Sequence, residues 1–318
     1  MTTSSLAIDV AGLTKSYGDH TVLDGVDLTV PEGTVYALLG PNGAGKTTVI
    51  NILSTLLTPG DGELRVAGFD VRREAAGVRS AIGVTGQFSA IDELLTGREN
   101  LRLMADLAHL DRTSVATTVT AALDRLDLAD AADRRAQTYS GGMKRRLDLA
   151  MTLIARPRLI FLDEPTSGLD PRSRRKLWAI VREQVADGVT VLLTTQYLDE
   201  ADHLADRIGV LDGGHLVAEG TAAQLKRQVP GGHVSVQLSD TAGLAAAASA
   251  HPGATANAEA LTLQVPHDGS LAGLRRVLDG LDDDGVTGVT VASADLDDVF
   301  LALTGHPADA PTPQELSA

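Results

Sequence analysis

The sequence has no cysteine and no long apolar run. The absence of cysteine from 318 residues excludes disulfides and thiolate metal sites, and it fits a reducing compartment. No stretch reaches the roughly 18 apolar residues that a membrane-spanning helix needs. The first residues, Met-Thr-Thr-Ser-Ser, lack the basic and apolar regions of a signal peptide. These features predict a soluble, cytosolic chain.

Basic residues are also scarce. The chain carries 27 Lys and Arg against 42 Asp and Glu, for a net charge of −15. This balance argues against nucleic acid as the main partner, since a phosphate-binding surface needs a basic stripe. Residues 230–318 hold 12 acidic and 2 basic side chains, and the change in charge falls at a turn-rich Val-Pro-Gly-Gly junction at 229–232. We therefore predict domains at 1–229 and 230–305, followed by a disordered tail at 306–318 that is rich in Pro and Ala.

The first domain alternates strand and helix patterns. Apolar, β-rich runs predict strands at 7–13, 22–30, 34–39, 64–67, 81–84, 159–162, 190–194 and 207–211. Helical stretches at 172–185 and 198–205 lie between the later runs. This order predicts an α/β domain with a largely parallel sheet. Residues 88–155 show only helical periodicity, and a gap of that length predicts an inserted helical subdomain.

A glycine-rich loop follows the strand at 34–39 and precedes a helix-like stretch. It consists of Gly40, Pro41, Asn42, Gly43, Ala44, Gly45, Lys46, Thr47 and Thr48. Glycines at this spacing let backbone N–H groups and the start of the next helix point at phosphates. Lys46 adds a charge near the β and γ phosphates, and the Thr47 hydroxyl can ligate Mg²⁺. The loop predicts that the chain binds a nucleoside triphosphate.

A second motif ends the strand at 159–162 in two acids. Asp163 and Glu164 are expected at the carboxyl edge of the sheet, where open α/β sheets place their ligands. Asp163 is suited to hold Mg²⁺, usually through water. Glu164 is suited to orient or deprotonate the attacking water. Without the phosphate loop, an acidic turn would be the preferred interpretation of this pair.

The segment Tyr-Ser-Gly-Gly-Met-Lys-Arg-Arg at 139–146 makes a family recognisable. It resembles the Leu-Ser-Gly-Gly-Gln signature of the ATPase subunit of ABC transporters, and the resemblance runs from residue 6 to about 229. Tyr17 matches the aromatic residue that stacks on adenine. Gln87 matches the glutamine that joins the nucleotide site to the membrane partner, and with Thr47 and Asp163 it is assigned to the Mg²⁺ site. Thr-Ser-Gly-Leu-Asp at 166–170 matches the loop that crosses to a second subunit.

The resemblance implies a mechanism that one chain does not complete. In this family Ser140, Gly141 and Gly142 open a helix that binds the phosphates of the partner's nucleotide. A head-to-tail homodimer would therefore close around two ATP molecules with Mg²⁺, and hydrolysis would open it. The expected second partner is an integral membrane permease, which would place the chain on the inner face of the cell membrane.

One departure from the family pattern points to a branch. Gln196 occupies the place of the usual switch histidine, in Thr-Gln-Tyr-Leu-Asp-Glu-Ala at 195–201. A glutamine can sense the γ phosphate by hydrogen bonds but cannot carry a positive charge. We expect Glu164 to be the main base and Gln196 a sensor. Tyr139 and Met143 also replace signature residues, and we expect them to tune packing more than chemistry.

The switch segment resembles the daunorubicin/doxorubicin-resistance type of drug exporter, which carries a C-terminal extension. Here strand patterns at 233–238, 261–265 and 286–291 and helical ones at 271–281 and 296–303 predict a small α+β domain. The acids at 282–284 are interpreted as a solvated surface. The favoured function is ATP-driven export of a hydrophobic, drug-like compound. The alternative is a soluble ABC ATPase acting on a ribosome or DNA-repair machine, which the acidic charge and the lack of a second ATPase domain disfavour.

Overall fold

The computed structural model describes residues 5–86, 90–228, 232–267, 270–281, 285–292 and 295–304. Gln87, the acids at 282–284 and the predicted tail at 306–318 lie outside these ranges. The described chain forms two compact units that divide between Thr221 and Ala222. The sequence placed this boundary at 229–230. In the structure the boundary comes earlier in the chain, because helix α8 (Ala222–Lys226) packs with α11 (Leu296–Thr304) of the second unit.

The first unit contains a central six-stranded sheet. Its order is β10-β9-β3-β8-β7-β6, and the contacts among β9, β3, β8, β7 and β6 are all parallel. The strands are β3 (Val35–Leu39), β6 (Ile82–Thr85), β7 (Leu159–Asp163), β8 (Thr190–Thr195), β9 (Arg207–Asp212) and β10 (His215–Gly220). Every residue of β3, β7 and β8 is buried, as expected of apolar strands covered on both faces. The predicted largely parallel α/β sheet is confirmed.

A separate antiparallel sheet covers part of this core. Its order is β2-β1-β4-β5, from β1 (Leu6–Tyr17), β2 (His20–Pro31), β4 (Glu63–Val66) and β5 (Phe69–Asp70). Helix α1 (Lys46–Leu53) shares one apolar cluster with this sheet and with β3 and β7. The other described helices of the first unit that lie outside the segment between β6 and β7 are α2 (Ala75–Ala81), α6 (Pro171–Ala186) and α7 (Leu198–Leu204). The sequence predicted strands at β1, β2 and β4 but not their assembly into a second sheet.

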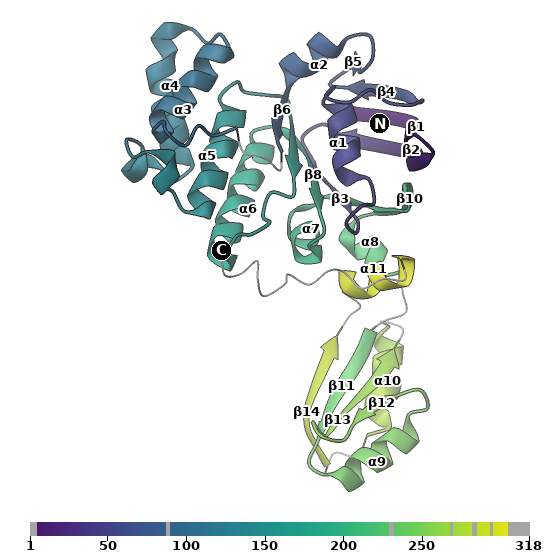
Figure 1. The fold of residues 1–318 in the computed structure, drawn as a ribbon. Coiled ribbons are helices and arrows are strands. Elements are labelled where there is room, and N and C mark those ends of the chain that lie inside the picture. The colour runs from purple at the N-terminus through teal and green to yellow at the C-terminus, as the bar shows by residue number, and fades with distance from the viewer. Residues whose placement is uncertain are drawn as a thin grey trace. The chain divides into compact units, whose positions relative to one another are not determined.

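Three helices are inserted between the neighbouring strands β6 and β7. They are α3 (Gly97–Leu107), α4 (Arg112–Arg125) and α5 (Gly141–Leu153), and they form a lobe beside the sheet (Figure 1). Each begins at a residue whose side chain accepts a hydrogen bond from the first turn: Thr96, Asp111 and Ser140. Such caps satisfy N–H groups that have no partner within a helix. Two short 3₁₀ turns, Ala129–Ala131 and Ala136–Thr138, join α4 to α5. The predicted helical subdomain is confirmed.

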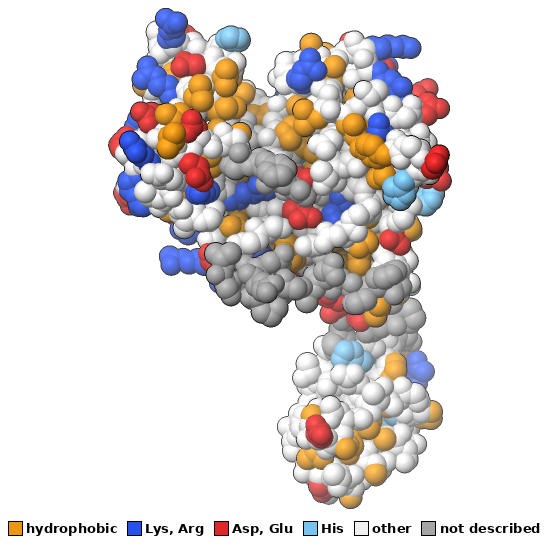
Figure 2. Space-filling view, viewed as in Figure 1, with side chains coloured by type: hydrophobic (Ala, Val, Ile, Leu, Met, Phe, Trp, Pro, Cys, Tyr) orange, Lys and Arg blue, Asp and Glu red, His pale blue; other side chains and the backbone are white. Residues whose placement is uncertain are grey.

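The second unit is a four-stranded antiparallel sheet with helices. Its sheet order is β12-β13-β11-β14, from β11 (Gly232–Leu238), β12 (Thr255–Asn257), β13 (Thr262–His267) and β14 (Val286–Ala292). Helices α9 (Thr241–Ala250) and α10 (Leu271–Asp279) supply Leu244 and Val277 to an apolar core shared with β11 and β13. The small α+β domain is confirmed. On the face drawn in Figure 2, basic and acidic side chains are interspersed over the first unit. Among the described helices of both units, none combines the length and apolar character needed to cross a membrane.

Candidate functional site

Neighbouring strands bring three distant segments to one edge of the central sheet. Strand β8 lies between β3 and β7, and all three run parallel. The glycine-rich loop follows β3, Glu164 follows β7 and Gln196 follows β8. Carboxyl ends of adjacent parallel strands meet at one edge, which is where open α/β sheets bind ligands. The topology therefore assembles the predicted site residues from positions far apart in the chain.

The glycine-rich loop adopts a shape that side chains would disrupt. Gly45 has a φ of +104° and Gly43 a φ of +84°, a region that residues with a Cβ rarely adopt. A Cβ on Gly40 would lie 2.3 Å from the backbone oxygen of Leu211. Lys46 is 5% exposed, and its Nζ donates to the carbonyl oxygens of Gly40 at 2.7 Å and Pro41 at 3.0 Å. The carbonyl groups of the loop thus hold the Lys46 ammonium beside the start of α1.

The two acids after β7 have different surroundings. Asp163 is 2% exposed, and its Oδ1 accepts a hydrogen bond from the Thr194 hydroxyl. Glu164 has a φ of +45°, and its backbone N–H donates to the Thr194 oxygen at 3.1 Å. A positive φ in a residue with a side chain is strained, and such strain clusters at functional sites. Asp163 is held inside the sheet edge, whereas Glu164 is turned out of the strand.

The Glu164 side chain contacts both the glycine-rich loop and the 166–170 loop. Its Oε1 is 4.0 Å from Nζ of Lys46, and its Oε2 accepts from the Ser167 hydroxyl at 3.1 Å. Both acids border a hollow of about 260 Å³ lined also by Gly141, Lys144, Arg145, Asp148, Ser167, Gly168 and Leu169. A carboxylate held by one hydroxyl and one distant ammonium keeps acceptor capacity for a water molecule. This position suits a general base acting near a phosphate.

The signature segment begins helix α5. Ser140 is its N-cap, with Oγ accepting from the Met143 N–H at 3.3 Å. A Cβ on Gly142 would lie 2.5 Å from Oγ of Ser173, so the glycine allows α5 to approach α6 closely. Tyr139 is buried and its hydroxyl donates to the Ala131 oxygen at 2.7 Å. Tyr139 therefore packs inside the helical subdomain, while Gly141 is exposed at the helix start.

Arg145, which sequence reasoning did not select, ties this helix to the acids. Its guanidinium donates to the backbone oxygens of Asp163 at 2.9 Å, Pro165 at 2.9 Å and Gly86 at 3.1 Å. Burial lowers the pKa of Arg145, while the nearby Asp148 carboxylate opposes that shift. The sequence offered only its place in a Lys-Arg-Arg run, because the three carbonyls come from remote segments.

Three further predicted residues fall around this edge or outside the described chain. Tyr17 is 51% exposed near the end of β1, and Lys15 Nζ lies 5.2 Å from its ring centroid. The open ring face is available for stacking. Gln196 is half-buried, and its Oε1 is buried without a hydrogen-bond partner among the described residues. Gln87 lies outside the described residues, so its two assigned roles stay predictions.

Glu200, four residues after Gln196, is a second residue that sequence reasoning missed. Its side chain is fully buried, and Oε1 accepts from Trp178 Nε1 of α6 at 3.1 Å. Beside it, the Arg174 guanidinium lies 5.0 Å from the Tyr197 ring centroid and donates to Asp199 at 3.0 Å. These contacts fix the switch segment against α6, the helix that starts at the end of the 166–170 loop. In the sequence, nothing distinguishes Glu200 from the rest of the switch segment at 195–201.

The Glu200→Gln variant should show an altered pH dependence of stability. Burial raises the pKa of Glu200 above its ordinary value of 4.5, although hydrogen bonds from its neighbours oppose the shift. The folded protein then holds this proton more tightly than the unfolded chain, so its contribution to stability is lost as pH rises above 4.5. We expect the melting temperature of the variant, relative to wild type, to rise between about pH 5 and about pH 8.

Thermal unfolding followed by circular dichroism measures this difference. Glu63→Gln is the matched control, since Glu63 is exposed. A difference between Glu200→Gln and wild type that stays constant across the pH range would contradict the assigned cause.

Comparisons with known proteins agree with this geometry. A family model described as ABC transporter matches residues 23–167. The chain is 49% identical to the daunorubicin resistance ATP-binding protein DrrA3 of Streptomyces coeruleorubidus, over 94% of this chain and 96% of that protein. It is 40% identical to the doxorubicin resistance ATP-binding protein DrrA of Mycobacterium tuberculosis, over 98% of both chains.

A solved structure supports the same assignment for the first unit. The ATP-binding subunit of an ABC transporter aligns with a TM-score of 0.64 at 29% identity, covering 70% of this chain and 93% of that one. The second unit is accounted for by the full-length relatives, whose similarity extends across nearly the whole chain. The chain belongs to the ABC transporter ATP-binding proteins of the daunorubicin/doxorubicin-resistance type.

Proposed function

We propose that the chain hydrolyses ATP as one of two identical subunits that drive a separate membrane permease. The family membership supports an ABC ATP-binding subunit of a drug exporter. The observation that carries the hydrolytic assignment is the 4.0 Å approach of Lys46 Nζ to Glu164 Oε1. At this separation the Lys46 ammonium can contact a phosphate group while the Glu164 carboxylate contacts the water molecule that attacks it.

Each predicted site residue has a proposed role. Residues 40–48 cradle the triphosphate, Lys46 neutralises it and Tyr17 stacks on the base. Glu164 accepts a proton from the attacking water. Gln196, whose Oε1 has no partner among the described residues, reports the γ phosphate. Once ATP binds, Lys46 exchanges the carbonyls of Gly40 and Pro41 for phosphate oxygens.

The donor set fits Mg²⁺. The Thr47 hydroxyl is half-buried beside the loop, and Asp163 offers a buried carboxylate, both of which are hard oxygen donors. Gln87 is the third proposed ligand. No group of three acidic, histidine or cysteine residues among the described ranges could form an all-protein cage. Mg²⁺ characteristically binds through one or two protein oxygens together with phosphates and water, and there it offsets phosphate charge.

Dimerisation is proposed from the position of the signature helix. Ser140 caps α5 with its own hydroxyl, and Gly141 is exposed beside it. The free N–H groups at this end and the helix dipole favour an anion. We assign that anion to the γ phosphate held by a second copy, arranged head to tail, so that two ATP molecules close the dimer.

An apolar surface on the helical subdomain supports a membrane partner. Leu103 and Leu107 lie one turn apart on α3 and are 44% and 64% exposed, and Leu94 just before this helix is 69% exposed. Exposed apolar patches mark interaction sites. Apolar side chains gather beside the notch at the top of the first unit in Figure 2. We assign this surface, named here the α3 leucines, to the permease, which would hold the chain at the inner face of the membrane.

Permease binding should depend on the α3 leucines. We expect the double variant Leu103→Asp and Leu107→Asp to keep its basal ATP hydrolysis but lose stimulation by a co-expressed membrane permease that stimulates the wild type. The measurement is Mg-ATP hydrolysis in lipid vesicles with and without that protein, together with co-purification. Leu271→Asp, at an equally exposed leucine of α10, is the matched control.

Two results would count against the proposal. If hydrolysis were indifferent to every membrane partner, the soluble ATPase would become the better interpretation. If stimulation survived in the double variant, the docking surface would lie elsewhere. The cargo is proposed by analogy with the names of the relatives, as a hydrophobic drug-like compound, because substrate choice need not reside in this subunit.

A further inference from the structure

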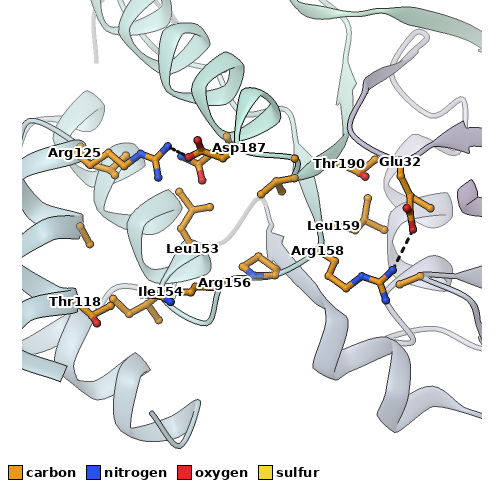
Figure 3. A pocket seen from close by; sticks show the side chains of 18 of the residues that line it. Glu32, Thr118, Arg125, Leu153, Ile154, Arg156, Arg158, Leu159, Asp187 and Thr190 are labelled. Atoms are coloured by element: carbon orange, nitrogen blue, oxygen red, sulfur yellow. Dashed lines mark hydrogen bonds and ion pairs between the residues drawn. The ribbon is translucent and has the colours of Figure 1, made fainter. Parts of the chain in front are cut away.

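A cavity of about 630 Å³ lies at the other end of the central sheet from the nucleotide loop. It opens between the helical subdomain and the amino ends of β7 and β8 (Figure 3). One wall comes from α4 and the end of α5, and the opposite wall from the sheet domain near Glu32. Small-molecule sites have volumes of roughly 300–1,000 Å³. The cavity therefore has the size of a site for one small organic molecule.

The lining combines apolar surface with a few charged groups. Ala122, Leu153 and Val189 line it, and all three are half-buried, so they offer apolar surface to the cavity. An apolar lining with a small number of placed polar groups is typical of ligand pockets. The lining suits an aromatic or aliphatic body.

Two of the three guanidinium groups that line the cavity are already neutralised. Arg158 forms an ion pair with Glu32 at 3.1 Å, and Arg125 pairs with Asp187; the two pairs stand on opposite sides in Figure 3. Arg125 also contacts Glu183 at 3.3 Å. Arg156, the third, has no ion pair or side-chain hydrogen bond with any of the described residues. Its charge is open to an anion.

We propose that this cavity binds a small molecule that joins one anionic group, held by Arg156, to an apolar body packed on Ala122, Leu153 and Val189. Arg125 and Arg158 are occupied by carboxylates, so Arg156 is the lining guanidinium that is open to an anionic group, although the chain as a whole is acidic. The limited volume excludes a folded partner from the site.

The cavity is mechanically linked to the nucleotide edge by α5. The 13 residues of this helix, Gly141–Leu153, follow the N-cap Ser140, the proposed phosphate contact, and end at Leu153 on the cavity wall. A helix of that length spans about 20 Å as one rigid element. A ligand wedged against its last turn would shift the orientation of its first turn. Occupancy should therefore change ATP hydrolysis, a consequence that rests on the proposed function of Ser140.

A fluorescent probe pair tests the binding. The full chain, with its nucleotide site saturated by a non-hydrolysable ATP analogue, is titrated with 1-anilinonaphthalene-8-sulfonate and, separately, with the uncharged N-phenyl-1-naphthylamine. These probes share an aromatic body and differ in the anionic group. We expect the sulfonate to bind at one site about tenfold more tightly than the neutral probe. Equal affinities, or no binding of the sulfonate to the nucleotide-saturated chain, would overturn the proposal.

Two variants place the binding in this cavity. Arg156→Ala should weaken the sulfonate probe about tenfold and leave the neutral probe unaffected. Ala122→Trp should exclude both probes by filling the space. Arg102→Ala, at an exposed arginine of α3, is the matched control and should bind like wild type. Thermal unfolding verifies that each variant is folded. If sulfonate affinity were unchanged in both cavity variants, the site would lie elsewhere.

The link to hydrolysis is measured separately. Steady-state ATP hydrolysis by the wild-type chain should change when the sulfonate probe is added, and Arg156→Ala should not respond at the same concentration. A probe that binds in the cavity of the wild type without altering hydrolysis would refute the coupling through α5 and leave the binding site standing. A chain that bound the probe but hydrolysed no ATP would instead count against the proposed function.

Discussion

Glu164→Gln should lower ATP hydrolysis by about 10²- to 10⁴-fold while ATP affinity stays close to that of the wild type. Glutamine keeps the size of the side chain and an oxygen that can accept from Ser167, but it cannot take a proton from water. The ammonium of Lys46 loses a partner 4.0 Å away and keeps its carbonyl contacts, so the phosphate loop remains formed. The variant should therefore accumulate as an ATP-bound dimer.

Single-turnover hydrolysis, equilibrium ATP binding and size-exclusion chromatography measure the three parts of this prediction. Lys46→Ala is the contrasting variant, because it should lose hydrolysis together with nucleotide affinity. Glu63→Gln controls for the loss of a carboxylate on the surface. A Glu164→Gln protein that turns over at the wild-type rate would show that another group activates the water.

Arg145→Lys should lower the free energy of unfolding by about 2 kcal/mol and impair hydrolysis as well. The planar guanidinium satisfies the oxygens of Gly86, Asp163 and Pro165 simultaneously, which an ammonium on a longer, flexible stem does not reproduce. A partly buried acceptor left without a donor destabilises the fold. Because two of these oxygens flank Glu164 in sequence, the same change should disturb the position of this proposed general base.

Urea unfolding followed by tryptophan fluorescence is the measurement for Arg145→Lys. The chain has one tryptophan, Trp178, and it lies on α6 of the first unit, so the signal reports that unit alone. Arg175→Lys, on the exposed side of the same helix, should unfold like wild type. If Arg145→Lys changed neither stability nor hydrolysis, water would have to replace the guanidinium at the three backbone oxygens.

Local patterns predicted the first unit where the physical cause was itself local. Strands buried on both faces are apolar throughout, which made β3, β7 and β8 recognisable from their residues. The glycine-rich loop was recognisable because Gly43 and Gly45 serve backbone angles that other residues rarely adopt. The helical stretch before β7 likewise predicted the insertion, because it is too long for an ordinary loop.

Other features depend on contacts that a local pattern does not contain. Helix α9 was missed because its run of alanines and small residues has no apolar face for periodicity to reveal. Strand β10 was missed because it pairs with β9 at the sheet edge and has few buried residues. Arg145 acts through carbonyls up to 59 positions away, and its two basic neighbours in the sequence look equivalent to it.

The insertion leaves the sheet from β6 and returns on β7, two strands that are paired side by side, with Ile82 opposite Leu159. The ends of the inserted segment are thus fixed close together whatever the segment contains. During evolution, α3 and α4 can lengthen, shorten or change their outer face without moving Glu164. Helix α5 lacks that freedom, because Arg145 donates to the backbone oxygen of Asp163 at the end of β7. Divergence among relatives should consequently concentrate in α3 and α4, where the chain can adapt to a new membrane partner while the hydrolytic chemistry is inherited unchanged.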